Sequence, residues 1–201
     1  MSWFYGRLMQ LDDLPRLATW QHTGVRSGYE VLFADVRLSG YRLRGSTTAF
    51  EADTAWSVGY RVDLDPRWHT RQVVAVATTI AGERRVSIRR LDEVRWAVNG
   101  ILRPDLDGCL DVDFESSGVT NTVPVHRGEF VPGEPVDAPA AFVRADDLRV
   151  HRMEQRYTLT SITAAGPTFA YESATFDFAC ELAFDTAGLI RDYPGIATRD
   201  R

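Results

Sequence analysis

Apolar and polar side chains alternate along much of this chain, with the period of two residues that is typical of a half-buried β-strand. The clearest case is residues 174–185, ATFDFACELAFD, where every second residue from Ala174 to Phe184 is apolar. Thr175, Asp177 and Glu181 lie among the residues of the opposite face. Twelve residues of alternation predict one long strand with one face in the core.

Similar strand patterns recur throughout the chain, and short turn sequences separate them. Alternation is found in 59–65, 84–90, 94–98 and 154–162, and apolar residues occupy both faces of 28–38 and 71–80. The turn signals are Ser39-Gly40, Asp65-Pro66, Ala81-Gly82, Asn99-Gly100, Gly166-Pro167 and Ala187-Gly188. Helical periodicity is short, and we expect minor helices only near 7–14 and 144–150.

These patterns predict an all-β fold with one domain over residues 1–201. We expect an antiparallel β-roll or an incompletely closed barrel, because curling a sheet of roughly ten strands hides its edges. The Pro/Gly-rich run 131–140 is predicted to be a loop within this domain, since strands of the same character follow it. A wide roll leaves an interior cavity, and we expect the functional site there.

The charge of the chain limits its partners. The formal net charge is −5, and all 23 basic residues are arginine. An acidic chain is a poor general binder of nucleic acid or of acidic membranes, so no nucleic-acid partner is expected. Arg84, Arg85, Arg89 and Arg90 stand close together, but on a strand they predict a solvated basic face that discourages edge pairing.

The sequence predicts a cytoplasmic protein without a bound cofactor. The N-terminal residues lack the apolar run of a signal peptide, and no stretch approaches the roughly 20 apolar residues of a membrane-spanning helix. The four histidines are scattered, and two cysteines are too few for a cysteine zinc site. No metal site is therefore expected. The oligomeric state is left open.

The segment 108–127, GCLDVDFESSGVTNTVPVHR, concentrates polar chemistry. Asp111 and Asp113 stand two residues apart on a predicted strand, which separates their Cα atoms by roughly 7 Å. At that distance two carboxylates raise each other's pKa or share a cation, a proton or an arginine. Asx residues also tie down turns through hydrogen bonds to the backbone, so a structural role for either aspartate stays open.

We predict a polar site from six residues: Arg71, Asp111, Asp113, Asn121, His126 and Arg127. Arg71 or Arg127 is expected to form a bidentate pair with Asp111 or Asp113, and a remaining arginine would anchor a ligand carboxylate or phosphate. The alternative is a structural network that holds the 115–124 loop. In that network Asn121 organises the turn.

Four aromatic residues with polar tips complete the predicted binding site: Trp56, Tyr60, Trp68 and Trp96. Indole and phenol rings stack on sugar faces and acyl chains while their polar tips hydrogen-bond. Core packing is the alternative for each of them. It is the stronger interpretation for Trp96, which shares a face with Val94 and Val98.

Several motifs make the chain resemble the putative glycolipid-binding family, formerly a bacterial domain of unknown function. They are GCLDVDF, TNTVPVHR, DPRWHTR (65–71) and GLIRDYPG (188–195), in collinear order between about Trp20 and Gly195. The resemblance implies a curved β-roll, similar in shape to bacterial lipoprotein carriers, with a cavity for lipid or glycolipid. Ser117-Gly118 and His126-Arg127-Gly128 depart from the family's usual Thr-Pro and Arg-Arg-Leu.

Together these observations predict non-catalytic binding of an amphipathic small molecule such as a lipid or glycolipid. A hydrolase or isomerase that uses Asp111 and Asp113 with His126 is the alternative, although carboxylates two apart on one strand point in parallel. No nucleophile elbow or nucleotide-binding glycine motif is present. A third possibility is an interaction module that pairs through an open sheet edge.

Overall fold

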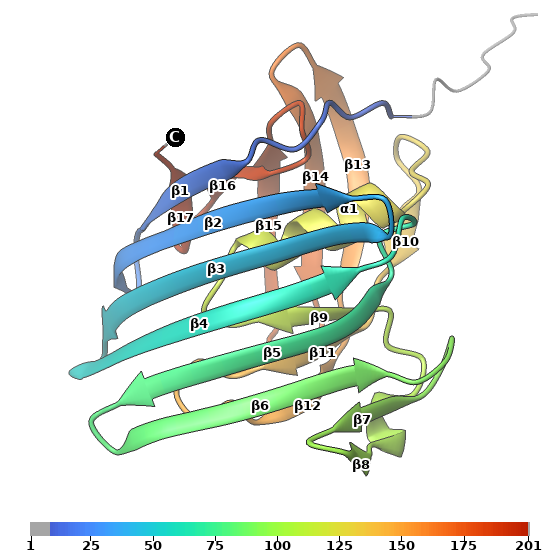
Figure 1. The fold of residues 1–201 in the computed structure, drawn as a ribbon. Coiled ribbons are helices and arrows are strands. Elements are labelled where there is room, and N and C mark those ends of the chain that lie inside the picture. The colour runs from blue at the N-terminus through green and yellow to red at the C-terminus, as the bar shows by residue number, and fades with distance from the viewer. Residues whose placement is uncertain (1–8, 201) are drawn as a thin grey trace, which may run out of the picture.

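In the computed structural model, which describes residues 9–200, fourteen strands form one continuous antiparallel sheet (Figure 1). Its order is β10-β13-β14-β15-β16-β17-β1-β2-β3-β4-β5-β6-β7-β8. The first half of the chain supplies β1 (Leu17–His22), β2 (Ser27–Arg37), β3 (Gly40–Glu51), β4 (Thr54–Leu64), β5 (Thr70–Thr79), β6 (Gly82–Arg90), β7 (Trp96–Val98) and β8 (Ile101–Leu102). The second half supplies β10 (Pro135–Asp137), β13 (Arg156–Thr163), β14 (Gly166–Ser173), β15 (Phe178–Phe184), β16 (Ile190–Tyr193) and β17 (Ala197–Arg199).

A second sheet of three strands lies inside the curve of the first. It contains β9 (Asp111–Phe114), β11 (Ala140–Val143) and β12 (Val150–Met153), with β11 in the centre. Two 3-10 turns (Pro104–Leu106 and Val119–Asn121) and the helix α1 (Thr122–Arg127) complete the described fold. Because β9 is parallel to β11 and covered on both faces, all four of its residues are buried.

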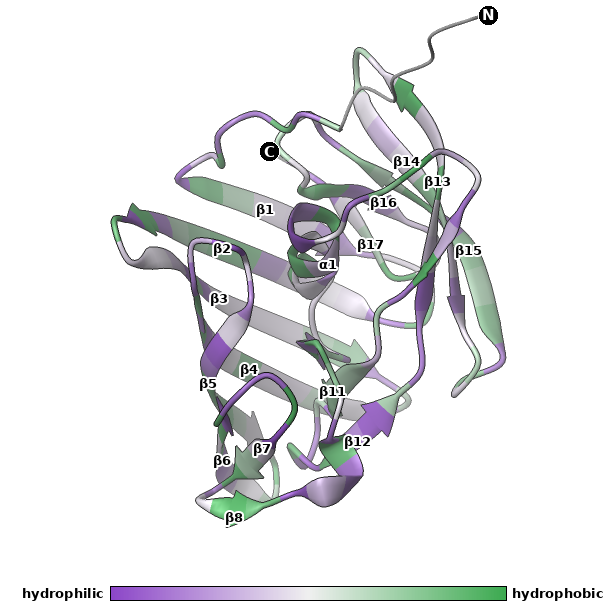
Figure 2. Cartoon of the chain, turned by 90° about the vertical axis from the view of Figure 1, so that its right-hand side faces the viewer, coloured by the Kyte–Doolittle hydropathy of each residue, from purple (hydrophilic) through white to green (hydrophobic). Residues whose placement is uncertain are grey.

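The large sheet curls without closing. Its terminal strands, β10 and β8, lie at opposite ends of the order, and the wall formed by β1–β6 faces the wall formed by β13–β15 (Figure 1). In a view turned by 90° about the vertical axis, α1 lies between these two walls (Figure 2). The predicted antiparallel β-roll or incompletely closed barrel is confirmed.

The predicted long strand at 174–185 is wrong in its first half. β15 begins at Phe178, and residues 174–177 form the turn that joins it to β14. The Phe176 amide donates to the Ser173 carbonyl at 3.2 Å, and Asp177 has a φ of 48°. Aspartate is one of the few residues that adopt this left-handed conformation readily. The alternation of apolar residues therefore continues through a turn that brings Phe176 to the surface.

The predicted helices are also wrong. Residues 9–14 and 144–150 contain no helix, and residues 7–8 of the first segment lie outside the described residues. The Arg144 amide donates to the Arg149 carbonyl at 3.0 Å, which closes 144–150 as a turn. The helix is instead α1, whose Pro124 lies in the first turn, where a missing N–H costs nothing. The predicted 131–140 loop contains the short strand β10.

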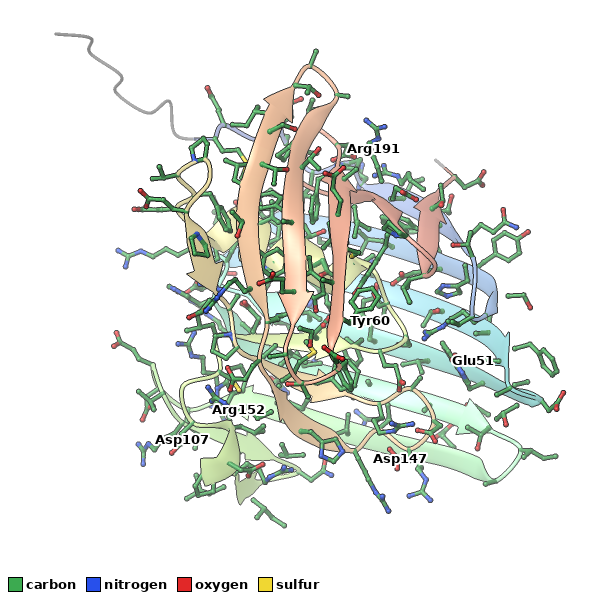
Figure 3. All side chains as sticks on the ribbon, turned by 180° about the vertical axis from the view of Figure 1, so that it is seen from behind. Glu51, Tyr60, Asp107, Asp147, Arg152 and Arg191 are labelled. Carbon is green, nitrogen blue, oxygen red and sulfur yellow. The ribbon has the colours of Figure 1, made fainter. Side chains whose placement is uncertain are left out.

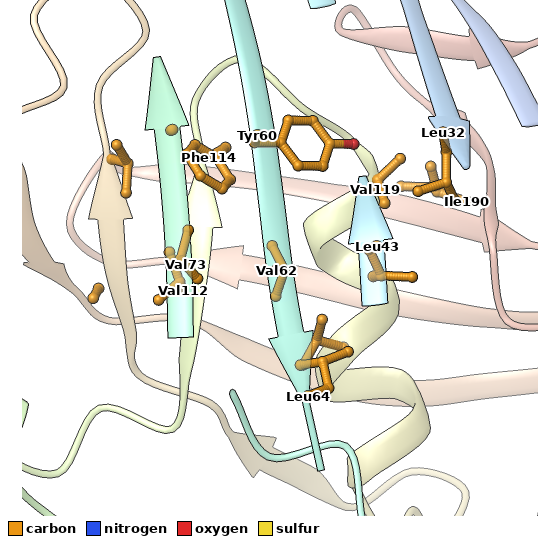
Figure 4. Close-up of a cluster of buried hydrophobic side chains, with 14 of the residues drawn as sticks. Leu32, Leu43, Tyr60, Val62, Leu64, Val73, Val112, Phe114, Val119 and Ile190 are labelled. Carbon is orange, nitrogen blue, oxygen red and sulfur yellow. The ribbon is translucent and has the colours of Figure 1, made fainter. Parts of the chain in front are cut away.

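The core fills the space between the sheets and α1 (Figure 4). Val62, Val73 and Val112 bring β4, β5 and β9 together there, and Tyr60 stacks on Phe114 with 5.3 Å between ring centroids. Gly45 pairs with Tyr60 across the sheet, and a Cβ there would lie 2.0 Å from the Tyr60 ring. Glycine at this position therefore lets the Tyr60 ring lie across β3.

Candidate ligand-binding cavity

A cavity of about 240 Å³ opens between the 113–121 segment and strands β12 and β14–β16. Its apolar lining consists of Phe114, Phe142, Met153, Phe176, Phe178 and Ile196. Its polar lining includes Arg26, Asp113, Ser117, Asn121, Tyr171 and Tyr193. A mostly apolar hollow with a few convergent polar groups is the usual form of a small-molecule site.

Aromatic rings form one wall of the cavity. Phe142 and Phe176 lie 4.9 Å apart between ring centroids, and Phe178 lies 6.3 Å from Tyr171 and 6.2 Å from Tyr193. Phe176 is 51% exposed because it lies on the β14–β15 turn. An aromatic side chain therefore stands at the opening of the cavity, in contact with solvent on one side and Phe142 on the other.

Asp113 is the buried acid of the cavity. Burial raises the pKa of its carboxyl to about 7, hydrogen bonds from the Thr120 hydroxyl and the Phe114 amide act to lower it, and the charge of Asp111 raises it further. A carboxyl with that pKa is partly protonated near neutral pH. It can therefore donate a hydrogen bond to a ligand hydroxyl when protonated, or accept one from that hydroxyl when ionised.

Asn121 connects the cavity to a network of buried hydroxyls. The Tyr157 hydroxyl donates to Asn121 Oδ1 at 2.7 Å, and Asn121 Nδ2 donates to the Gly118 carbonyl at 3.3 Å. The Tyr171 hydroxyl donates to Gln155 Oε1 at 3.0 Å. Asn121 therefore has the turn-organising contacts expected of it, and it also lines the cavity.

Arg26, which the sequence patterns did not single out, supplies the cation of the cavity. It lies in the turn between β1 and β2, and its Nη1 donates to the Glu115 carbonyl at 2.7 Å. Its Nε lies 3.1 Å from Glu51 Oε2, and its guanidinium lies 5.4 Å from the centroid of the Trp56 ring. Trp56 thus packs behind Arg26, outside the cavity lining.

Glu30, also missed from the sequence, fastens the 117–119 turn to the sheet. Its carboxyl accepts hydrogen bonds from the Tyr60 hydroxyl (2.7 Å), the Gly118 amide (3.1 Å) and the Ser117 hydroxyl. Burial raises the pKa of this carboxyl to about 7, and the hydrogen bonds act to lower it. Tyr60, predicted to contact ligand, therefore supports Ser117 at the cavity edge.

The predicted arginine–carboxylate pair is confirmed for one combination. Arg127 Nε and Nη2 donate to the two carboxylate oxygens of Asp111 at 3.1 and 2.7 Å. Asp111 is 1% exposed, and the pair joins α1 to β9. Arg71 lies elsewhere, in a surface groove with Arg67 and Arg90, and pairs with neither aspartate.

The remaining predicted residues lie outside the cavity. The ring of His126 stacks on Trp68 at 3.8 Å, and its Nε2 lies 2.8 Å from the Ala187 carbonyl. Burial lowers the pKa of His126 to about 4. Trp96 is fully buried, and its Nε1 donates to the Cys109 carbonyl at 3.1 Å, so it is a core residue. Of the ten predicted residues, Asp113 and Asn121 line the cavity.

Similarity to known proteins agrees with this architecture. The model of a family described as putative glycolipid-binding matches residues 17–199. A crystal structure of a DUF1089 family protein from Pseudomonas aeruginosa has a TM-score of 0.75 and 26% sequence identity, over 94% of this chain and 95% of that one. No protein of curated function gives a significant match.

A more distant structure shares the fold alone. A β-barrel-like protein of the domain of unknown function DUF1849, from Brucella abortus, has a TM-score of 0.55 and 12% identity, over 94% of this chain and 95% of that one. Within residues 9–200, no helix is long and apolar enough to cross a membrane.

Proposed function

We propose that this chain, which belongs to the putative glycolipid-binding family, binds a small sugar-bearing amphiphile in the cavity beside Asp113. The observation that carries the proposal is the junction of an aromatic wall with a cluster of buried hydrogen-bonding groups in one hollow. The family's description agrees with a ligand of this class.

The aromatic wall suits the apolar part of such a ligand. Phe142, Phe176 and Phe178 present ring faces and edges, and Met153 adds a flexible side chain. Burying a chain of methylene groups here gains roughly 0.8 kcal/mol for each one removed from water. A ligand tail would lie along this wall and leave the cavity beside Phe176, where the wall meets solvent.

The polar groups suit a neutral head group that carries hydroxyls. Asp113 and Asn121 offer oxygen acceptors, and Tyr171 and Tyr193 carry hydroxyls on the same side. The charge of Arg26 is already balanced by Glu51 at 3.1 Å, so a ligand need not be anionic. Such a mixture of donors and acceptors can hydrogen-bond to the hydroxyls of a sugar, whereas a bare hydrocarbon would leave these polar groups without partners.

The size of the cavity limits how much of a ligand it encloses. At about 240 Å³ it is smaller than the roughly 300–1,000 Å³ of sites for drug-sized ligands. We infer that it encloses one sugar ring and the first part of a chain. The remainder of the ligand would extend past Phe176.

Octyl glucoside below its micellar concentration is a suitable probe, with binding followed by calorimetry. We expect Phe176→Asp to weaken binding about tenfold or more, because a charge at the opening opposes entry of the octyl chain. Phe50→Asp is the matched control, since Phe50 is 53% exposed and lies on β3, away from the cavity lining. Equal weakening by both changes, or by neither, would contradict the assignment.

The alternative is a hydrolase or isomerase, which would need Asp111, Asp113 and His126 to lie together at one site. The structure does not bring these three side chains together there. Asp111 is neutralised by Arg127, and His126 lies between Trp68 and the Ala187 carbonyl. Asp113 alone of the three lines the cavity. Binding without chemistry is therefore the function that the geometry supports best.

A further inference from the structure

A second hollow, of about 550 Å³, lies between β6 and the turn that precedes β12. Its charged lining is Arg84, Arg85, Arg103, Asp147, Arg149 and His151, and we call it the arginine groove. It shares no lining residue with the cavity beside Asp113. Asp147 marks its position at the lower end of the molecule (Figure 3).

Both walls of the arginine groove are held by hydrogen bonds. Arg103 Nη2 donates to the Val150 carbonyl at 2.8 Å, which joins the two walls. The Asn99 amide donates to the Ser87 carbonyl at 2.7 Å, and Asn99 Oδ1 accepts from the Ser87 amide at 2.9 Å. The groove is therefore part of the folded framework, with little ordering left to occur when a ligand binds.

Two of its four arginines are already neutralised. Arg103 donates to both carboxylate oxygens of Asp105, at 2.7 and 2.6 Å. Arg149 lies 3.1 Å from Asp147, although it is 76% exposed and this pair is screened by water. Among the described residues that line the groove, Asp147 is the only one with a carboxylate.

Arg84 and Arg85 supply the uncompensated charge. Neither forms an ion pair within residues 9–200, although 14 ion pairs involve other residues of that range. Arg84 shares a face of β6 with the buried Val86 and Ile88, so it is directed toward the opposite wall of the groove. Arg85 lies on the other face of the strand, beside Ser87, and borders the groove. A chain with a net charge of −5 thus carries two arginines without an ion pair, within residues 9–200, on the strand that borders this groove.

We infer that the arginine groove binds a phosphoryl oxyanion, as a phosphate ester or an anionic lipid head group. Guanidinium groups hydrogen-bond phosphate oxygens in pairs and stay charged at all physiological pH values. The groove is larger than a phosphate group needs, so an organic portion fits beside Val86 and Leu148. This site is independent of the proposed sugar-binding cavity.

The test uses two probes, inorganic pyrophosphate by calorimetry and phosphatidylcholine vesicles with or without phosphatidic acid by co-sedimentation. We expect the double variant R84Q/R85Q to weaken binding of at least one probe about tenfold. R89Q is the matched control, because Arg89 lies on β6, forms no ion pair within residues 9–200 and does not line the groove. Unchanged circular dichroism and thermal midpoint would show that both variants are folded.

The probe that responds identifies the source of the phosphate. Pyrophosphate binding that is lost only in R84Q/R85Q supports a soluble phosphate ester. Binding restricted to phosphatidic acid vesicles, and lost in the same variant, supports a lipid head group. Equal losses in R84Q/R85Q and R89Q would reveal general surface attraction and overturn the proposal, as would no binding of either probe.

Discussion

Replacing Arg127 with methionine is expected to lower the free energy of unfolding by about 3–5 kcal/mol, because it leaves the buried carboxylate of Asp111 without a partner. Asp111 is 1% exposed and receives both of its hydrogen bonds from the Arg127 side chain. Methionine keeps most of the aliphatic length, so lost packing contributes little. Urea denaturation at neutral pH measures the change.

Two further variants separate burial of charge from loss of an ion pair. The double replacement Asp111→Leu with Arg127→Met is expected to recover most of the lost stability, because no charge then remains buried. Arg95→Met breaks the exposed pair between Arg95 and Asp92 and is expected to change stability far less. A small loss for Arg127→Met, similar to that for Arg95→Met, would contradict the structural role of the pair.

Asp113→Asn is expected to change the pH dependence of stability. Burial raises the pKa of the Asp113 carboxyl to about 7, above the ordinary 3.8 of an aspartate, so the folded state holds this proton more tightly. The stabilisation is complete below the unfolded pKa and is lost as the pH rises through 7. A shift of one pKa unit corresponds to roughly 1.4 kcal/mol. Between pH 4 and pH 8, the free energy of unfolding of the wild type therefore falls by at most about 4 kcal/mol relative to that of the asparagine variant.

The test is the difference in free energy of unfolding between the wild type and Asp113→Asn, followed as a function of pH. Burial lowers the pKa values of His22 and His126 to about 4, so these residues add stability as the pH rises from 4 to 6.5. They offset the opposite trend of Asp113 and Glu30 in the wild type, and the difference between wild type and Asp113→Asn removes their contribution. A stability difference that does not vary with pH would show that the Asp113 carboxyl is not desolvated.

Local patterns in the sequence predict most of the sheet. Alternation at 84–90 falls within β6, and alternation at 59–65 and 154–162 falls for most of its length within β4 and β13. Alternation cannot locate a turn whose residues happen to continue it, which is why the predicted strand at 174–185 included Phe176. The sequence also predicts a bidentate pair of Arg71 or Arg127 with Asp111 or Asp113, and of these combinations Arg127 with Asp111 is the one that forms.

The cavity is harder to predict, because its residues meet only when the sheet curls. Arg26 lies just before β2, whereas Phe142, Phe176 and Tyr193 come from segments more than a hundred residues away. Nothing in their local sequence distinguishes them from surface or core residues. The buried glutamate in a strand with Leu32 and Ala34 on the same face was the one available signal, since an acid at a core position needs a partner.

The most direct test of the proposed binding site is an NMR titration of the protein, carrying ¹³C-methyl methionine, with octyl glucoside. The chain has three methionines, and Met153 lines the cavity, whereas Met9 does not. We expect a saturable shift of the Met153 methyl signal and nuclear Overhauser contacts from it to the octyl chain, with Met9 unchanged. Saturable binding that leaves Met153 unaffected, or no binding below the micellar concentration, would contradict a sugar-bearing amphiphile in this cavity.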